Sequence, residues 1–569
     1  MIRITQLKLP ITHTEEELRG KVAKTLRVDP SRLGEIRIRK QSIDARKKSE
    51  VFYVYTVDVT LREDQNQRVN VSHILKKVNS NNIMLTNEQE YAFPNPGDRP
   101  LSHPPVIVGS GPAGLFCAYA LASMGYAPIV LERGKQVQQR SRDVAEFWRT
   151  GRLLPDSNVQ FGEGGAGTFS DGKLTTLVKD PAGRSRMVLS SFIRFGAPER
   201  IAYEAKPHIG TDVLVAVIEE MRREIIRLGG TFLFETCLVD LICEKNRICG
   251  VACRRKDNST IQIDTDLLVL AIGHSARDTF TMLYEKGVPM EAKSFAVGFR
   301  VEHPQEMISI RQYGEKAAAL LPPAPYKVTA NLENGRGVYS FCMCPGGYVV
   351  NASSEQNMLA VNGMSYSRRD GHNANSAIIV SVTPDDFEKE LKKTELSAAG
   401  VPNQLNSVEA LQPNSAGTLI HPLLGVAFQR SLERKAYELG AGRIPQQLFG
   451  DFEQGQESRT YGGFESAARG GTSFAPLHEL FGEDLKQSFI QGMHRFAKAI
   501  PDFDRYDCIL SGVESRTSSP VRITRNETFM SSLAGLYPCG EGAGYAGGIM
   551  SAAMDGLKVA EAIIKEYKP

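Results

Sequence analysis

The sequence predicts an α/β fold of several domains, organised around a parallel sheet of the doubly wound type. Two glycine-rich elements carry this prediction. In the first, the apolar run at residues 106–108 leads into Gly109-Ser110-Gly111-Pro112-Ala113-Gly114, a GxGxxG pattern followed by a helix-forming segment rich in Ala and Leu. In the second, residues 536–539 run into Gly540-Glu541 and then a helix from about Ile549. A strand, a glycine turn and a helix in this order are typical of dinucleotide-binding folds.

Each glycine of the first element has an expected structural role. Gly109 makes the turn, Gly111 lets the backbone approach a pyrophosphate, and Gly114 lets the helix pack against the strand. The helix N-terminus offers free N–H groups and a positive dipole end to the phosphates. Glu132 follows Gly111 by 21 residues, where a carboxylate accepts hydrogen bonds from both ribose hydroxyls and repels a 2′-phosphate. The element therefore favours FAD or NAD over NADP.

The composition is that of a soluble globular protein, with 41% hydrophobic and 23% charged residues among 569. No uninterrupted apolar run reaches membrane-spanning length, and the first residues form no signal-peptide pattern, so no membrane partner is expected. The net charge of +3 is too small to indicate a nucleic-acid partner for the chain as a whole. Nine scattered cysteines without CxxC pairs indicate reduced thiols in the cytoplasm and argue against a metal site.

The length predicts more than one core, and we expect four segments. Residues 1–95 form a small α+β domain of ferredoxin-like type, in which Thr14 and Glu17 make a capping box, residues 51–61 a strand and residues 71–78 a second helix. Residues 96–280 and 506–569 form the two parts of the nucleotide-binding domain. Residues 281–505 form an inserted mixed α+β substrate domain. Five prolines within residues 93–105 make a stiff linker after the first domain.

The N-terminal domain is basic, with 17 Lys and Arg against 12 Asp and Glu in residues 1–95. Six of these cations lie within residues 37–48: Arg37, Arg39, Lys40, Arg46, Lys47 and Lys48. Such a stretch contacts RNA or an acidic protein partner, or is simply a solvated hairpin. We favour the hairpin, because no stacking-aromatic motif accompanies the charges.

Residues 160–174 contain five glycines interleaved with Phe161 and Phe169. So many glycines indicate a backbone that approaches a pyrophosphate or a flavin ring closely, with a plain flexible loop as the alternative. Further along, residues 211–228 form an amphipathic helix, residues 231–235 a strand, and residues 238–254 a hairpin of the β-meander. The buried strand at residues 266–272 delivers Gly273 and His274 to the ligand crevice. His274 is either close to the cofactor or a loop histidine without chemistry.

Residues 281–505 contain no second GxGxxG. Cys342 and Cys344 form either a redox pair or two structural thiols, and we favour the latter, because cysteines two apart form only strained disulfides. Arg516 and Arg522 flank residues 518–520 and either clamp a carboxylate or phosphate or serve as surface charges or internal ion pairs. The catalytic residues stay unassigned, with His274, Arg516, Cys342 and Cys344 as candidates.

In the second glycine element, Glu541 is placed for a polyol hydroxyl. The helix that begins after Gly547-Gly548 points its positive end at developing negative charge.

The two glycine elements, with Ala271-Ile272-Gly273 between them, resemble the FAD-binding domain of the glutathione-reductase-like flavoproteins. More narrowly, QFGEGGAGTFSDGKL, KPHIGTD, CMCPGG, GMSYSRRDGHNANSA, ESRTSSPVR and YPCGEGAGYAGGIMSAAMDG resemble an uncharacterised bacterial family of FAD-dependent or NAD(FAD)-utilising dehydrogenases. The resemblance implies FAD: Gly109, Gly111, Gly114 and Glu132 hold ADP, Leu238 lies by the adenine, Glu541 meets the ribityl chain, and Gly547, Gly548 and Ile549 meet the ring. We expect the FAD to be non-covalent, because the sequence shows no typical His or Cys attachment motif. The remaining expected cofactor residues are Ser110, Pro112, Ala113, Arg133, Gly165, Ala166, Gly167, Thr168, Lys173, Gly273 and Gly540.

These observations predict an FAD-dependent oxidoreductase that transfers hydride at flavin N5, with a small molecule, anionic if the arginines bind it, as substrate. NAD(P)H is a candidate donor that binds only transiently, because a second dinucleotide fingerprint is missing. Two alternatives stay open. One is a flavin-dependent RNA-modifying enzyme that grips RNA with the basic N-terminal domain. The other is a non-catalytic FAD-binding module whose N-terminal domain docks a protein.

Overall fold

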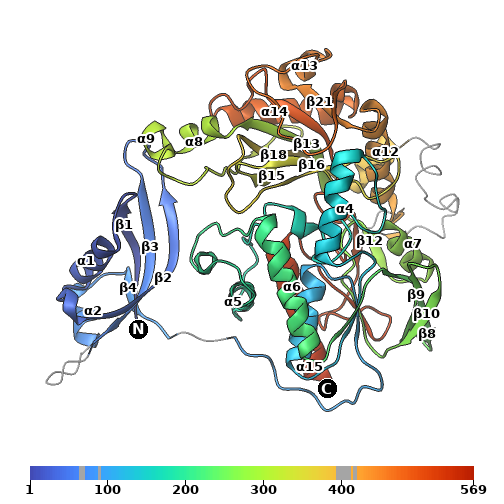
Figure 1. The fold of residues 1–569 in the computed structure, drawn as a ribbon, viewed down its shortest axis with the longest axis horizontal. Helices are drawn as coiled ribbons and strands as arrows, with labels where there is room; N and C mark the ends of the chain where they lie inside the picture. Colours follow the sequence, from blue (N-terminus) through green and yellow to red (C-terminus); the bar gives the residue numbers. More distant parts are fainter. Residues whose placement is uncertain (63–70, 88–90, 392–411, 414–418) are drawn as a thin grey trace.

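The computed structural model describes residues 1–62, 71–87, 91–391, 412–413 and 419–569. It contains three bodies, each built on its own main sheet (Figure 1). We call residues 1–85 the N-terminal module, residues 93–292 with 515–569 the parallel-sheet module, and residues 293–514 the cap. No helix in the described ranges is both long and apolar enough to cross a bilayer.

The N-terminal module has the βαββαβ order and the strand order β2-β3-β1-β4, with every pairing antiparallel, as expected for a ferredoxin-like unit. The predicted capping box is present: the Thr14 hydroxyl accepts from the Glu17 N–H at 3.3 Å, and the Glu17 carboxylate accepts from the Thr14 N–H at 2.8 Å. The elements are β1 (Ile2–Pro10), α1 (Glu15–Leu26), β2 (Leu33–Asp44), β3 (Phe52–Leu61), α2 (Val71–Val78) and β4 (Ile83–Leu85).

The parallel-sheet module contains five parallel strands in the order β25-β11-β5-β6-β7. Alternate residues face opposite sides, so that Ile107 points to a core shared with three helices and Val108 to a core shared with an antiparallel meander. The strands are β5 (Val106–Val108), β6 (Ile129–Leu131), β7 (Thr231–Leu233), β11 (Leu268–Leu270) and β25 (Leu536–Pro538).

Helices α3 (Pro112–Ser123), α6 (Thr211–Arg227) and α15 (Ile549–Glu566) cover one face of this sheet. The meander β8 (Thr236–Glu244), β9 (Arg247–Arg255) and β10 (Thr260–Asp264) covers the other, which confirms the predicted α/β architecture. The remaining helical elements of the module are α4 (Val137–Thr150), η2 (Ala166–Phe169), α5 (Arg184–Arg194), η3 (Glu199–Ala202) and α7 (Arg277–Glu285); β12 (Met290–Ala292) pairs with β24 (Val521–Ile523).

The cap is a seven-stranded sheet in the order β14-β15-β18-β13-β23-β21-β22, packed against helices. Its last central strand, β23, lies beyond residue 505, where we placed the end of the inserted domain. The strands are β13 (Phe295–Pro304), β14 (Thr329–Asn331), β15 (Gly337–Cys344), β18 (Asn373–Val382), β21 (Ile444–Leu448), β22 (Thr472–Phe474) and β23 (Ile509–Glu514).

The helices of the cap are α8 (Gln305–Tyr313), α9 (Glu315–Ala318), α10 (Pro384–Glu390), α12 (Leu424–Leu439), α13 (Phe449–Gln454) and α14 (Glu483–Ala497), with η6 (Leu477–Glu479). Two small hairpins complete it, β16 (Tyr348–Asn351) with β17 (Val361–Met364), and β19 (Gln412–Pro413) with β20 (Leu419–Ile420).

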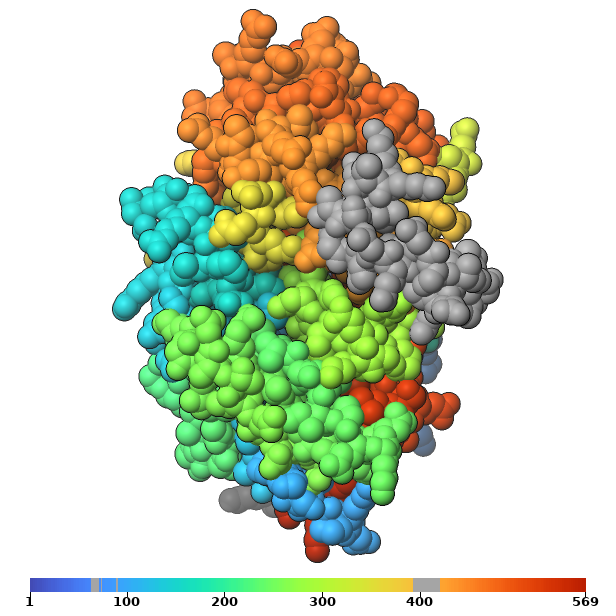
Figure 2. Space-filling view, turned by 90° about the vertical axis from the view of Figure 1, so that its right-hand side faces the viewer, coloured from blue at the N-terminus to red at the C-terminus, as the bar shows by residue number. Residues whose placement is uncertain are grey.

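The three bodies contact one another. The cap stacks on the parallel-sheet module (Figure 2), and Trp148 of α4 donates to the Asn351 carbonyl at 2.9 Å across that interface. The N-terminal module places Ile43 and Tyr53, from its β2–β3 hairpin, against the core of the cap. Its edge strand β2 also hydrogen-bonds to the parallel-sheet module at residues 203–205, a contact that the linker prediction does not include.

Candidate functional site

One cavity of about 1380 Å³ lies where the carboxyl ends of the parallel strands meet the cap and the N-terminal module. Sites for one drug-sized ligand have volumes of roughly 300–1,000 Å³, so this cavity is larger than one such ligand needs. All three bodies contribute to its walls. It is therefore the candidate functional site.

The first glycine element forms part of the cavity floor. Gly111 is the N-cap residue of α3, and no side chain caps the free N–H groups of that helix. A Cβ added at Gly111 meets only the Gly165 Cα, at 3.7 Å, whereas one added at Gly114 lies 1.9 Å from the Gly109 carbonyl oxygen. Gly114 is thus a packing glycine, and Gly111 is open to the cavity, where an anion can approach the helix end.

Glu132 lines the cavity, but its carboxylate also ties two loops together. It accepts from the Ser110 N–H at 3.0 Å, the Ser110 hydroxyl at 2.7 Å, the Gly134 N–H at 2.9 Å and the Gly162 N–H at 3.1 Å. These four bonds occupy the usual acceptor positions of a carboxylate. Glu132 therefore shapes the GxGxxG turn itself, and its bond to a ribose stays a prediction.

Arg140 holds the glycine-rich loop in shape. This fully buried side chain donates to the carbonyls of residues 158, 159, 162, 163 and 165 at 2.7–3.2 Å. The sequence-based prediction did not include this role for Arg140. The available signal was its position on the apolar face of α4, between Val137 and Val144, where an unpaired arginine is costly to bury.

The second glycine element lines the same cavity. Gly547 and Gly548 precede α15, and a Cβ added at either one meets nothing within 4 Å. No side chain caps this helix N-terminus either. Burial raises the pKa of Glu541 to about 7, and the nearby Lys293 ammonium opposes that rise. Two positive helix ends and a carboxyl group that titrates near neutrality thus share one cavity.

Most of the predicted residues meet in this cavity. Its lining includes Gly109, Gly111, Pro112, Ala113, Glu132, Arg133, Gly165, Ala166, Gly167, Lys173, Leu238, Gly273, His274, Cys342, Arg516, Glu541, Gly547, Gly548 and Ile549. Five predicted residues do not line it: Ser110, Gly114, Thr168, Cys344 and Gly540. Gly540, for example, lies where an added Cβ would be 2.6 Å from the Ala113 Cβ, so it serves the packing of the sheet against α3.

His274 lies on the cavity wall in a cationic setting. Its Nδ1 is 2.8 Å from the Ser275 hydroxyl. Burial, reinforced by the charges of Arg516 and Arg277, lowers the pKa of His274 to about 3. The imidazole is therefore neutral at physiological pH and is suited to hydrogen bonding rather than to carrying charge.

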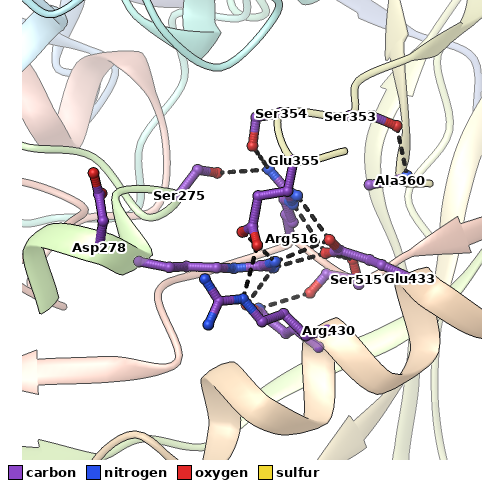
Figure 3. A network of polar contacts seen from close by, with 12 residues as sticks. Ser275, Asp278, Ser353, Ser354, Glu355, Ala360, Arg430, Glu433, Ser515 and Arg516 are labelled. Carbon is purple, nitrogen blue, oxygen red and sulfur yellow. Dashed lines mark hydrogen bonds and ion pairs between the residues drawn. The ribbon is translucent and has the colours of Figure 1, made fainter. Parts of the chain in front are cut away.

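Arg516 belongs to a buried ion-pair network (Figure 3). Its Nε and Nη2 donate to the two Glu433 carboxylate oxygens at 2.9 and 2.7 Å, and Nη1 donates to the Ser354 hydroxyl at 2.6 Å. Arg277 donates to the same two oxygens at 2.7 and 2.9 Å. The Arg516 fork is thus occupied within the protein, which is the internal ion pair that we considered alongside a substrate clamp.

Cys342 is held at the cavity wall by an irregular strand end. The β15–β18 pairing shifts register between Phe341 and Cys344, and Cys342 adopts a φ of 44°. The buried Arg300 donates to the Cys342 carbonyl at 2.8 Å. The pKa of the Cys342 thiol is lowered by its interaction with the Cys344 side chain and by the nearby charges of Arg300 and Lys173. The pKa of Cys344 is raised, mainly by burial.

We expect Cys342 to react with iodoacetamide at pH 6.5, where ordinary thiols are protonated, because only the thiolate is nucleophilic. Cys243 is the matched control, since it is more exposed and burial raises its pKa. Peptide mapping of the FAD-free protein should show Cys342 labelled first at pH 6.5 and Cys243 only in alkaline solution. Labelling of both cysteines with the same alkaline pH dependence would contradict the assignment.

Comparisons with known proteins agree with this geometry. An uncharacterised protein from Clostridium beijerinckii is 42% identical over 571 residues, which covers 100% of this chain and 99% of that protein. The family described as "FAD-dependent protein, C-terminal domain-like" matches residues 294–517, and an NAD(P)-binding Rossmann-like domain matches residues 107–152. The chain belongs to this FAD-dependent protein family. A domain of unknown function, DUF8436, matches residues 1–60.

Two solved structures are matched by this FAD-dependent protein at low similarity. The FrdA chain of quinol fumarate reductase from E. coli is 11% identical, with 81% of this chain and 69% of that chain covered and a TM-score of 0.34. L-proline dehydrogenase from P. horikoshii is 13% identical, with 82% and 94% covered and a TM-score of 0.32. At such values the likeness carries no information about the substrate.

Proposed function

We propose that the protein is an oxidoreductase that binds FAD non-covalently and acts on an anionic small molecule. The observation that carries this proposal is the convergence of two uncapped helix N-termini, at Gly111 and Gly548, on one cavity of about 1380 Å³. One helix end suits a pyrophosphate and the other suits a ring that gains negative charge.

The residues of the cavity fit FAD. Glycines leave backbone open to it at residues 111, 547 and 548, so that a flat or anionic group can come close. We assign the ADP half to the GxGxxG turn and Glu132, the adenine to Leu238, the ribityl chain to Glu541, and the ring to residues 547–549. The glycine-rich loop at residues 165–167, held by Arg140, closes the floor beneath them.

FAD, when bound, supplies two-electron hydride chemistry. The residues of the chain bind and orient the reactants around it. The α15 N-terminus stabilises negative charge beside residues 547 and 548. The Glu541 carboxyl holds or accepts a proton near neutral pH, because its pKa is about 7. The cap covers the cavity and excludes water. The part of the cavity that is lined by Arg39 and Lys40 of the N-terminal module receives the substrate or a transiently bound NAD(P)H.

The RNA-modifying alternative has less support from the contacts of the basic stretch. Arg39 donates to Asp58 at 2.6 Å, and Arg46 and Lys8 both pair with Asp44 at 2.7 and 2.9 Å. These cations form ion pairs within the module, although Lys8 and Arg46 share Asp44 and Arg39 shares Asp58 with Arg3. Salt-sensitive binding of tRNA would nevertheless favour an RNA substrate over a small molecule.

Anaerobic reduction tests the proposal. The purified protein should carry a flavin that acid or heat releases, and the flavin absorbance should bleach with NADH, NADPH or one of a panel of anionic metabolites. A flavin that none of these donors reduces, although dithionite does, would favour the non-catalytic FAD-binding module instead.

Gly548→Val should weaken FAD binding and shift the flavin midpoint potential to more negative values. The Cβ faces open cavity and the backbone is extended, so the fold tolerates valine, but the side chain holds the ring away from the helix end. A partly buried helix terminus contributes about 0.3–2 kcal/mol, which corresponds to roughly 10–40 mV for a two-electron couple. Potentiometry measures the shift. Gly20→Val is the control, because an added Cβ there also meets nothing within 4 Å but lies on α1, and it should leave the potential unchanged. An unchanged potential in Gly548→Val would show that the N-terminus of α15 does not stabilise the reduced flavin.

A further inference from the structure

The outer arm of the cavity, between the parallel-sheet module and the N-terminal module, contains a pair of uncompensated lysines. Residues 172–174 and 207–209 run antiparallel, with the Leu174 N–H bonded to the Pro207 carbonyl at 2.9 Å and the Ile209 N–H to the Gly172 carbonyl at 3.0 Å. Lys173 is directly opposite His208, so Lys206 is its diagonal neighbour on the same face. Both lysines line the cavity.

The charges of these lysines are not neutralised by neighbouring acids. Lys173 donates to the Met343 carbonyl, and no acceptor for Lys206 occurs in the part of the chain that the structure describes. Burial lowers the pKa of Lys206, and the charges of Lys173 and Arg369 lower it further. The nearby acids are engaged elsewhere: Asp171 with Arg369 at 3.0 Å and Glu204 with Arg200 at 3.3 Å.

The N-terminal module forms the outer wall of this arm. Gln41, on the free edge of β2, donates its backbone N–H to the Tyr203 carbonyl at 2.7 Å, and its carbonyl accepts from the Ala205 N–H at 2.8 Å. Lys206 follows this contact directly, and Arg39 and Lys40 of β2 line the same cavity. The pairing thus joins the module to the segment that carries one of the two lysines.

We propose that Lys173 and Lys206 form the anion-binding subsite for the substrate, and that the N-terminal module completes this subsite through β2. The inference rests on the proposed function and specifies its ligand: a small molecule with an oxyanion group, carboxylate or phosphate, of two or more negative charges. Two ammonium groups on neighbouring residues of one face, neither of them paired with a carboxylate among the described residues, bind such a group by charge-assisted hydrogen bonds. The N-terminal module is then part of the substrate site and not a separate appendage.

Calorimetric titration of the full-length, FAD-loaded protein with inorganic phosphate and with malonate, at constant ionic strength, tests the subsite. At least one probe should bind at one site per chain, and which probe binds distinguishes a phosphate from a dicarboxylate. Lys206→Gln and Lys173→Gln should each weaken that binding by about tenfold. Lys47→Gln, an exposed lysine on the β2–β3 hairpin away from the cavity, should have no effect. Binding of neither probe, or equal binding by Lys206→Gln and the wild type, would overturn the proposal.

Gln41→Pro tests the role of the module. Proline removes the N–H that bonds to Tyr203 but no backbone bond to β3, because that N–H points away from the sheet. The side-chain bond from Gln41 to the Tyr55 hydroxyl of β3, at 2.8 Å, is lost as well, and Gln41→Ala, which loses only that bond, is the control. The substitution should weaken anion binding, and unchanged binding would overturn the part of the proposal that concerns the module. Flavin content, measured from the absorbance of the same samples, separates the two levels: a wild type that carries full FAD but binds neither anion overturns only this subsite, whereas a wild type without flavin overturns the proposed function.

Discussion

Gly111→Val should give a folded protein that purifies colourless. The backbone at Gly111 has a φ of −74°, which valine adopts readily, and the nearest atom to an added Cβ is the Gly165 Cα at an ordinary 3.7 Å. The protein without cofactor therefore has space for the side chain. The pyrophosphate does not, because the valine methyl groups occupy the position from which it contacts the α3 N-terminus. The ratio of flavin absorbance to protein absorbance should fall almost to zero.

Two glycine controls make this result specific. Gly20→Val adds the same side chain to the surface of α1 and should retain full flavin. Gly114→Ala places a Cβ 1.9 Å from the Gly109 carbonyl oxygen, so it should damage the fold itself and reduce soluble yield. Near-stoichiometric FAD in Gly111→Val would show that the first glycine element does not hold the pyrophosphate.

Glu433→Ala should be strongly destabilising, by about 3–5 kcal/mol, the usual effect of removing one partner from a buried ion pair. Glu433 is fully buried and is the only carboxylate that touches both Arg277 and Arg516 among the described residues. Its pKa is well below the usual range: the two guanidinium groups outweigh the opposing effect of burial. Without it two buried cations face one another. Thermal unfolding of the FAD-free protein should show the loss as a much lower midpoint.

The matched control is Glu146→Ala, which breaks the exposed pair with Arg149 and should cost at most about 1 kcal/mol. Glu433→Gln retains the acceptor oxygen and the side-chain volume, so its unfolding midpoint should lie between those of Glu433→Ala and Glu146→Ala. If Glu433→Ala and Glu146→Ala unfold at the same temperature, the network does not stabilise the junction between the cap and the parallel-sheet module.

Local patterns accounted for the parts of the molecule that depend on neighbouring residues. The strand, turn and helix around Gly111 are encoded within a short stretch of chain, and α2 is observed at Val71–Val78 as predicted. The contacts of Glu433 join it to Arg277, 156 residues away, and such a pair has no periodicity to reveal it. The same holds for Gln41 and Tyr203, and this is why the N-terminal module was predicted as an independent unit.

The candidate site also combines features that neighbouring residues encode with contacts between residues far apart in the sequence. Glycines at 111, 547 and 548 were predictable because an open backbone needs a particular residue type. Arg516 was ambiguous, because an arginine suits an internal carboxylate as well as a substrate and only the fold shows that Glu433 is present. Lys173 was predicted from the glycine-rich string, but its neighbour Lys206 required the antiparallel contact of residues 172–174 with 207–209.

The hydrogen bonds from Arg140 to five carbonyl groups have a thermodynamic consequence. A glycine-rich loop that became ordered only when its ligand arrived would lose about 1–2 kcal/mol of backbone entropy per residue at that moment. Here the guanidinium fixes residues 158–165 during folding, so that cost falls on the stability of the protein and not on ligand affinity. The loop is therefore preorganised, because it has its ligand-binding shape before the ligand binds.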